Sequence, residues 1–404
     1  MKTIKKYTLW FFTLSIGFVL LMTAVYLIPN SALAVRQKNS IEFVEKEGMY
    51  PTVIFDAPAA QLDNYTDRLM LSKNMVEPGY NAFQAAMYVN NYARYWHGYQ
   101  VFLRPLLTVF TYQQIRYLNM FVQFLLLCLT FSMLHRKAGW KPALVFLLSV
   151  VCIYFMLVPA SLQFSSVFII MFSAIICLLR FHATAKFKSA PLFFMIIGML
   201  TNFFDLLTAP LLTLGIPLLI YLYLEINVGT PPWVQCLKKL FFCSFAWTAG
   251  YGLCWLSKWM IASAALQQNV IKDAISSILF RTGGNEQYQT NRIETLRINF
   301  ETMFLSQGRR VFAVLCLLLL CLLFLLIVFH RKKGWLPASC FLLVALYPYI
   351  WYLVLSNHSQ IHHWFTYRIQ TITLFGVFLF FIERIDWNRC RLSLRKLLRH
   401  PARS

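Results

Sequence analysis

The chain has 404 residues, of which 59% are hydrophobic and only 13% are charged. This composition excludes an ordinary soluble domain, and several apolar runs reach the length of about 18 residues that an α-helix needs to cross a bilayer. The net charge of +22 does not indicate nucleic acid. Lysine and arginine concentrate in short loops and in the tail, where membrane topology and contact with anionic membrane lipids account for them.

The first apolar run covers residues 7–28 and follows Lys2, Lys5 and Lys6. Its length of about 20 residues exceeds the roughly 7–15 residues of a signal-peptide core, so we interpret it as an uncleaved first helix. The basic N-terminus then lies in the cytoplasm, and residues 30–112 form a long outer loop.

Nine further apolar spans follow, at residues 113–134, 142–159, 164–180, 190–204, 207–224, 240–263, 310–330, 336–355 and 369–384. Alternating them across the bilayer brings the basic loops to one side. The sequence therefore predicts an all-α polytopic bundle of about ten transmembrane helices in the cell membrane, as one domain over residues 1–404. Both termini are cytoplasmic in this topology, and residues 385–404 form a basic tail.

A second long outer loop covers residues 264–309. It contains two short helical patterns, NVIKDAISSILF and TNRIETLRINFETMFL, separated by Gly283-Gly284. Neither pattern has the apolar content of a separate folded domain, so we expect two polar helices on the outer surface.

Candidate catalytic carboxylates lie in the first outer loop. Asp63 and Asp67 are four residues apart, which places them on one face of a helix. A carboxylate can accept the proton of a sugar hydroxyl as that hydroxyl attacks. Asp67 is our choice for this role, because a position near a helix N-terminus would keep it ionised. Asp63 is the alternative and Asp56 a less favoured one, while two ordinary solvated acids remain the structural interpretation.

Large aromatic residues follow in the same loop at helical spacing. Tyr88, Tyr92, Tyr95 and Tyr99 recur at steps of four, three and four, which predicts a helix from Tyr80 to Tyr99 along the outer membrane surface. The basic residues among and after these tyrosines are candidates for binding a lipid phosphate, namely Arg94, His97 and Arg104. A simple interfacial anchor is the structural alternative.

Two later segments add candidates. Asp205 lies in TNFFDLLTAPLL, at the outer end of an apolar span, where an ionisable residue is costly and therefore a functional candidate. The last outer loop, SNHSQIHHWFTYR, contributes His358, His362 and Arg368, which suit an anionic headgroup. Because the two histidines lack the glutamate of an HExxH zinc motif, we expect no metal site. We expect no cofactor either, with a divalent metal left open.

The segments YWHGYQVFLRPLL, NFFDLLTAPL and HHWFTYR, together with the long acid-bearing first loop, resemble bacterial members of the GT-C superfamily of membrane glycosyltransferases. The resemblance covers the layout of the whole chain. It implies transfer of a sugar from a polyprenyl-phosphate carrier to a cell-envelope glycan or lipid acceptor on the outer face. It also implies an acid of the first loop as base, which maps to Asp67 or Asp63.

Other classes of function remain open. A transporter or flippase for a lipid-linked sugar could use Asp205 and the basic outer residues as a path, although no inverted repeat or matched pair of broken helices supports it. A glycan polymerase or ligase, and an accessory subunit without catalysis, are further alternatives.

Overall fold

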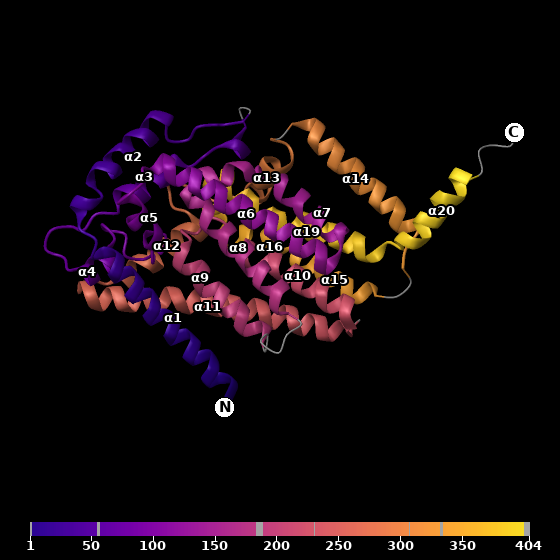
Figure 1. Cartoon of the computed structure of the whole chain (residues 1–404), viewed down its shortest axis with the longest axis horizontal. Coiled ribbons are helices and arrows are strands. Elements are labelled where there is room, and N and C mark those ends of the chain that lie inside the picture. Colours follow the sequence, from indigo (N-terminus) through magenta and orange to yellow (C-terminus); the bar gives the residue numbers. More distant parts are fainter. Residues whose placement is uncertain are drawn as a thin grey trace.

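The computed structural model describes residues 2–54, 57–182, 189–229, 231–306, 308–331 and 334–399. Over these residues the chain is helical, and the only β-type pairs are isolated bridges. The helices form an elongated bundle (Figure 1). We call the end formed by residues 30–112 and 267–306 the loop end, and the opposite end, from which the C-terminal helix projects, the tail end.

Among these described residues, seven helical segments are long and apolar enough to cross a membrane. They are α1 (Lys2–Tyr26), α6 (Tyr112–Ala138), α8 (Leu162–Phe181), α10 (Leu212–Gly229), α11 (Trp233–Leu266), the pair α15 (Trp335–Ala345) and α16 (Tyr347–Val354), and the run of α18 (His363–Thr366), η4 (Tyr367–Gln370) and α19 (Thr371–Arg384). Three shorter apolar helices accompany them: α7 (Trp140–Val151), α9 (Ala190–Phe204) and the apolar part of α14 (Arg309–Val328). These helices confirm the all-helical architecture and the presence of membrane-spanning helices, while the number of about ten transmembrane helices stays a prediction.

The tightest helix pair is α9 with α11. A Cβ atom on Gly198 would lie 2.2 Å from the carbonyl oxygen of Trp247, and one on Gly250 would lie 2.3 Å from that of Met195. Small residues at facing positions let two membrane helices approach to backbone contact, where van der Waals packing replaces the hydrophobic effect that lipid cannot supply. These two glycines therefore fix α9 and α11 together near their middles.

The first loop folds into four short helices, α2 (Ala34–Glu47), α3 (Asn64–Ser72), α4 (Ala82–Tyr88) and α5 (Gln100–Leu107), with the 3₁₀ turns η1 (Asn30–Ala32) and η2 (Pro58–Ala60). The predicted continuous helix from Tyr80 to Tyr99 is wrong beyond Tyr88. Val89, Asn90, Asn91 and His97 have positive φ angles, which end the helical path. Asparagine tolerates the left-handed region, because its short polar side chain can hydrogen-bond locally.

Gly98 explains how the irregular segment after α4 is held against the bundle. Its N–H donates to the carbonyl oxygen of Phe203 at 2.8 Å. A Cβ atom there would lie 2.5 Å from the Phe203 ring and 2.6 Å from its carbonyl oxygen. Only glycine permits this approach of the loop backbone to the end of α9. The contact sets the position of Tyr95 and His97, which immediately precede it.

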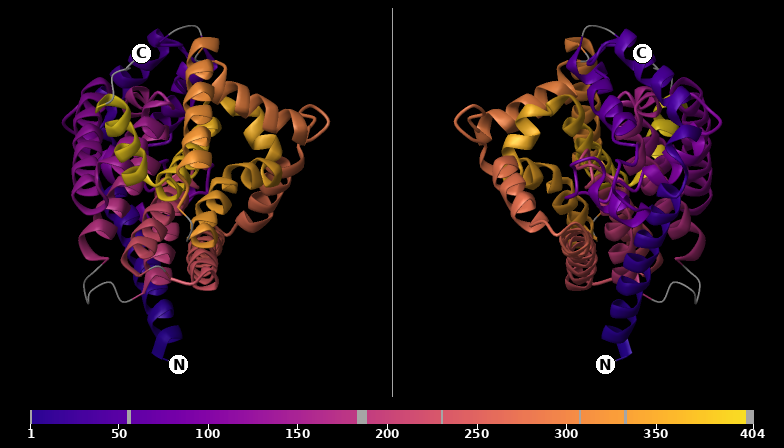
Figure 2. Two further views of the ribbon diagram at one scale, coloured as in Figure 1. Left: turned by 90° about the vertical axis from the view of Figure 1, so that its right-hand side faces the viewer. Right: turned by 90° about the vertical axis from the view of Figure 1, so that its left-hand side faces the viewer.

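The second loop contains the two predicted helices, α12 (Val270–Gly283) and α13 (Arg292–Phe304). Both stand beside α17 (Ser356–Ile361), on the side of the molecule away from α2 and α3 (Figure 2). The remaining elements are η3 (Phe155–Ala160) and the C-terminal helix α20 (Trp387–Arg399). The loop end is therefore built from two separate loops that meet over the ends of α9 and α11.

Candidate functional site

Asp67 is completely buried, and both of its carboxylate oxygens are occupied. The hydroxyls of Tyr112 and Ser161 donate to it, the latter at 3.1 Å, as do the amide groups of Leu162 at 3.2 Å and Gln163 at 3.0 Å. These amides belong to the first turn of α8, where a carboxylate is stabilised by the helix dipole. Burial raises the pKa of Asp67, and the positive charge of Arg116 acts against that shift. This arrangement locks α3 to α6 and α8 and leaves no free acceptor site.

Asp63 caps the N-terminus of α3. It accepts hydrogen bonds from the amide of Thr66 at 2.9 Å and from its hydroxyl at 3.0 Å, as aspartate at this position commonly does. Burial raises its pKa to about 6, with the neighbouring charge of Asp67 adding to the shift. Its geometry is that of a helix cap. Asp56 lies outside the described residues.

The four basic candidates for a phosphate pocket contact different partners. Arg104 donates to the carbonyl oxygens of Val25 at 2.8 Å and Ile28 at 2.6 Å, and also to that of Asn74. It thus fastens the end of α1 to the first loop. Arg368 is buried against the Phe164 ring, 4.4 Å from its centroid, and donates to the carbonyl oxygen of Trp364 at 2.9 Å.

Arg94 and His97 lie closer together, on either side of Tyr92. Arg94 stacks on the Tyr92 ring at 4.3 Å and forms an ion pair with Asp273 of α12 at 3.1 Å. His97 donates from Nε2 to the carbonyl oxygen of Tyr92 at 2.9 Å and accepts from the hydroxyl of Tyr99 at 3.0 Å. Burial lowers the pKa of His97 to about 3, so the ring is neutral. The structure does not gather Arg94, His97, Arg104 and Arg368 into the single pocket that the sequence suggested.

Asp205 lies in the turn after α9, and its hydrogen-bond partners differ from those of Asp63 and Asp67. Its carboxylate accepts from the amide of Thr208 at 3.0 and 3.1 Å, and within the described residues it takes part in no ion pair. Burial raises the pKa of Asp205 to about 7, against the hydrogen bonds from the turn that favour the ionised form. A carboxyl group with this pKa exchanges its proton near neutral pH, as a general base must.

Leu207, inside the same turn, has a φ of 71°. A bulky residue in the left-handed region is strained and persists only where its surroundings hold it there. The Nε2 of His358 donates to the carbonyl oxygen of Leu207 at 2.9 Å and thereby ties the turn to α17. Burial lowers the pKa of His358 well below its ordinary value, with His362 and Arg281 beside it. His358 is therefore a neutral support of the Asp205 turn.

Arg281, near the end of α12, is a member of this group that the sequence analysis missed. It donates to the hydroxyl of Tyr95 and lies within electrostatic range of His358 and His362. The hydroxyl of Tyr251 on α11 lies within range of both Arg281 and Asp205. No local motif marks Arg281, because only the packing of α12 over α11 and α17 brings it here. Asn357 contributes to that packing by donating to the carbonyl oxygen of Phe280 at 2.8 Å.

We call the group formed by Asp205, Arg281, His358 and His362, with Tyr95 and Trp255, the central cluster. Two of its polar atoms, Nδ1 of His362 and Nε1 of Trp255, are buried and have no hydrogen-bond partner in the described part of the chain. The His362 ring lies 4.9 Å from that of His358, and burial lowers the pKa of His362 to about 4. Buried polar atoms are nearly always hydrogen-bonded in folded proteins. Both nitrogens are therefore available to hydrogen-bond a polar ligand.

The open space beside the central cluster is small. A cavity of about 10 Å³ lies between three parts of the chain. Its lining includes Tyr95 of the first loop, Trp255 of α11 and Arg281 of α12. That volume corresponds to about one water molecule. A sugar can therefore enter only if α12 moves away from α11. Across the described residues, no three histidine, cysteine, aspartate or glutamate side chains are grouped so that they could hold a metal ion.

Comparisons with known proteins do not assign a family. No protein-family model matches the chain, and neither a curated protein nor a solved structure shows a significant similarity to it.

Proposed function

We propose that the protein is a GT-C-like glycosyltransferase that moves a sugar from a polyprenyl-phosphate carrier to a cell-envelope glycan or lipid acceptor. In this proposal the loop end faces the outside of the cell membrane, and both termini lie in the cytoplasm. The observation that carries the proposal is the set of contacts through which His358 links Asp205, Arg281 and His362, because it bonds the turn of Asp205 and lies beside both other residues. Asp205, Arg281 and His362 come from three separate segments and supply a proton-accepting carboxyl group, a cation and an unpartnered ring nitrogen.

The chemistry divides among these residues as follows. The guanidinium of Arg281 binds the lipid phosphate, to which arginine offers two parallel donors. Asp205 takes the proton from the acceptor hydroxyl as its oxygen attacks the anomeric carbon of the sugar. The bond between that carbon and the phosphate oxygen breaks, and the lipid phosphate leaves as an anion. His362 is left to hydrogen-bond a sugar hydroxyl through Nδ1.

Asp205 takes the role of base in this proposal instead of Asp67. Both oxygens of Asp67 are already used by four donors, so an acceptor hydroxyl would have to displace one of them. Within the described residues, every donor to Asp205 belongs to its own turn. Its raised pKa of about 7 also suits a group that must accept a proton near neutral pH and release it afterwards.

Turnover by the purified protein tests the proposal. The substrates are short-chain polyprenyl-phosphate hexoses and pentoses, supplied with an envelope lipid extract as acceptor. Asp205→Asn should lower the rate by about 10²–10⁴-fold, the usual loss for a general base. Asp63→Asn is the matched control, because asparagine caps a helix as well as aspartate does, and it should retain turnover.

Two results would contradict the assignment. Full turnover by Asp205→Asn would remove this residue as base. Movement of the lipid-linked sugar across proteoliposome membranes, without any transfer by the wild-type protein, would favour the transporter instead.

A further inference from the structure

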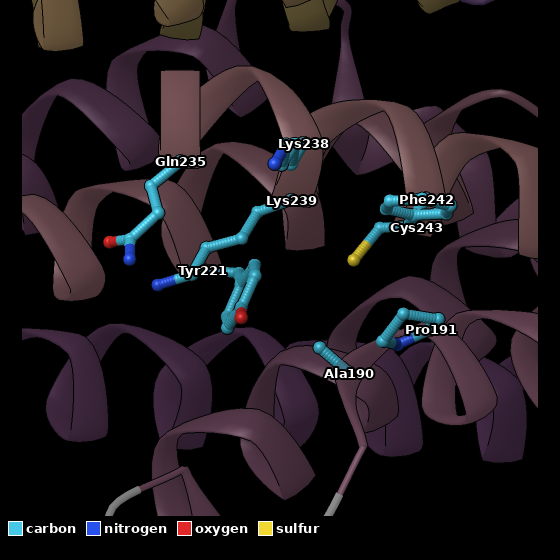
Figure 3. A pocket seen from close by; sticks show the side chains of 8 residues that line it. All are labelled: Ala190, Pro191, Tyr221, Gln235, Lys238, Lys239, Phe242 and Cys243. Atoms are coloured by element: carbon cyan, nitrogen blue, oxygen red, sulfur yellow. The ribbon is translucent and has the colours of Figure 1, made fainter. Parts of the chain in front are cut away.

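A second cavity lies at the tail end, far along the bundle from the central cluster. It has a volume of about 260 Å³ and lies between the start of α9, the second half of α10 and the first turns of α11 (Figure 3). The residues that line it are Ala190, Pro191, Tyr221, Gln235, Lys238, Lys239, Phe242 and Cys243. The proposed transfer reaction uses none of them.

The lining of this cavity has a polar side and an apolar side. The amide of Gln235 and the amino group of Lys239 lie on one side in Figure 3, and Phe242, Cys243 and Pro191 lie on the other. Phe242 is 53% exposed, so an apolar surface continues from the cavity to the outside of the bundle, where lipid chains would lie. A ligand that fits both sides has a polar head and an apolar chain.

The two lysines differ in how their charges are balanced. Lys239 forms an ion pair with Glu225, and His182 bonds the same carboxylate at 2.6 Å. Lys238 is exposed and takes part in no ion pair within the described residues. Among the described residues, one positive charge of the cavity is therefore uncompensated, and it favours a negatively charged head over a zwitterionic one.

The depth of Lys238 agrees with a lipid headgroup. Trp233 is the first residue of α11, and tryptophan collects at the boundary between membrane and water. Lys238 follows five residues later, which is about 7–8 Å along the helix. A lysine at this depth, in a cavity between membrane helices, faces the phosphate layer of the bilayer. Basic pockets between helices on the cytoplasmic side are typical sites for anionic lipids.

We propose that this cavity binds one anionic phospholipid. Its phosphate pairs with Lys238 and is hydrogen-bonded by Gln235, while an acyl chain lies along Phe242 and Pro191. The lipid belongs to the leaflet at the tail end, the side on which the topology puts the cytoplasm. This site is independent of the proposed sugar transfer and holds whether or not that reaction occurs.

Photo-crosslinking tests this proposal on the full-length protein in nanodiscs of phosphatidylcholine. The probe is a phosphatidylglycerol with a photoreactive acyl chain, added at low mole fraction, and a phosphatidylcholine with the same chain is its control. We expect the crosslink to map to the start of α9 and the first turns of α11. Lys238→Gln should weaken labelling about fivefold, equivalent to about 1 kcal/mol for one lysine at an anionic membrane surface.

Lys272→Gln is the matched control variant, because Lys272 is an exposed lysine at the loop end. It should label like the wild type. Equal labelling of Lys238→Gln and wild type would overturn the proposal, and so would equal labelling by the phosphatidylcholine probe at these positions. Loss of the crosslink on adding millimolar inorganic phosphate would also overturn it, because the cavity would then select free phosphate over the lipid.

Discussion

Asp67 and Asp205 are both buried carboxyl groups at the loop end, and both have raised pKa values. They even share a neighbour, since Gln163 donates its amide to Asp67 and accepts at its carbonyl oxygen from Thr208, in the turn of Asp205. Their surroundings nevertheless differ. Asp67 joins three helices through four donors and lies near the charge of Arg116, whereas the donors that the described residues supply to Asp205 all belong to its own turn.

The difference shows that burial and charge do not by themselves separate a structural carboxylate from a reactive one. The number of donors already bound to the carboxylate oxygens does separate them. A buried hydrogen-bond network in which every polar group is paired makes a protein rigid. A network with unpaired groups can still bind a polar ligand, and leaving those groups unpaired inside a protein is costly. Four donors occupy both oxygens of Asp67, whereas the carboxylate of Asp205 accepts from the amide of Thr208 in its own turn. Buried polar atoms without a partner within the described residues lie near both carboxylates, and near Asp67 they are Nε of Arg116 and Oε1 of Gln163. In the central cluster, His362 and Trp255 each keep an unpartnered nitrogen.

The largest expected effect comes from Asp67→Asn. An amide cannot accept from all four of the donors now held by the carboxylate, because its nitrogen would face two of them, whereas Arg116 keeps its ion pair with Glu47. A buried donor left without an acceptor costs about 1–3 kcal/mol, so we expect a loss of about 2–6 kcal/mol in the free energy of unfolding for two such donors. Denaturant titration in detergent micelles measures it. If the variant unfolds like the wild type, Asp67 is not the structural centre described above.

Gly98→Ala should have the next largest effect, because its methyl group would meet both the ring and the carbonyl oxygen of Phe203. Forcing an extra methyl group into a packed site costs about 1–3 kcal/mol. The same substitution would push Tyr95 and His97 away from α9 and so reduce the rate of turnover as well. Gly79→Ala is the comparison that separates crowding from backbone strain, because Gly79 lies in open space at a φ of 91°, whereas Gly98 is crowded and has no positive φ.

The pH dependence of turnover should report Asp205. Its pKa is about 7, so the proton-accepting form is lost below that value, and the rate should fall about tenfold per pH unit there and level off above it. His362, with a pKa of about 4, adds no step between pH 5 and 8. A rate that does not change between pH 5.5 and 8 would exclude Asp205 as base.

Stability should change with pH in the opposite sense. The folded protein holds the proton of Asp205 more tightly than the unfolded chain does, where the pKa is close to 3.8. The contribution of this residue to stability is therefore greatest below pH 4 and is lost as the pH rises to about 7. Asp205→Asn should remove that part of the pH dependence, as thermal unfolding over the same pH range can measure.

The smallest effect is expected for Asp273→Asn. Its ion pair with Arg94 joins α12 to the first loop, but the Asp273 side chain is 53% exposed. An exposed ion pair contributes about 0–1 kcal/mol, so the free energy of unfolding should hardly change. If α12 must move for substrate to enter, the weakened contact should instead lower KM slightly. A loss of more than about 2 kcal/mol would show that the pair is much more strongly coupled than exposed pairs usually are.

The apolar spans could be predicted from sequence because hydrophobic length alone selects them. The two helices of the second loop followed from their polar periodicity in the same way. The spacing of the tyrosines predicted a longer helix than the one that forms. Steps of three and four residues cannot reveal that the backbone leaves the helical region at Val89 to Asn91. Local turn hydrogen bonds and the close contact at Gly98 decided the conformation there.

The candidate site was predictable only in part. Asp205 was identified because an ionisable residue at the end of an apolar span is costly, and His358 and His362 because their position in the last outer loop suits an anionic headgroup. Their grouping was not predictable, nor was the participation of Arg281, because these residues come from helices up to about 150 positions apart that meet only in three dimensions. The partners of Asp67 were equally hidden, since Ser161 lies 94 residues further along the chain.

The glycine contact between α9 and α11 has one more consequence. Gly250 lies 17 residues from Trp233 and 16 from Leu266, the two ends of α11. The close contact with α9 therefore lies almost at the centre of α11. The part of α11 on either side of this contact is about 25 Å long. A tilt of α11 about the contact would move its two ends by similar distances in opposite directions. The lysines of the tail-end cavity lie on one half of the helix, and Trp255 of the central cluster lies on the other.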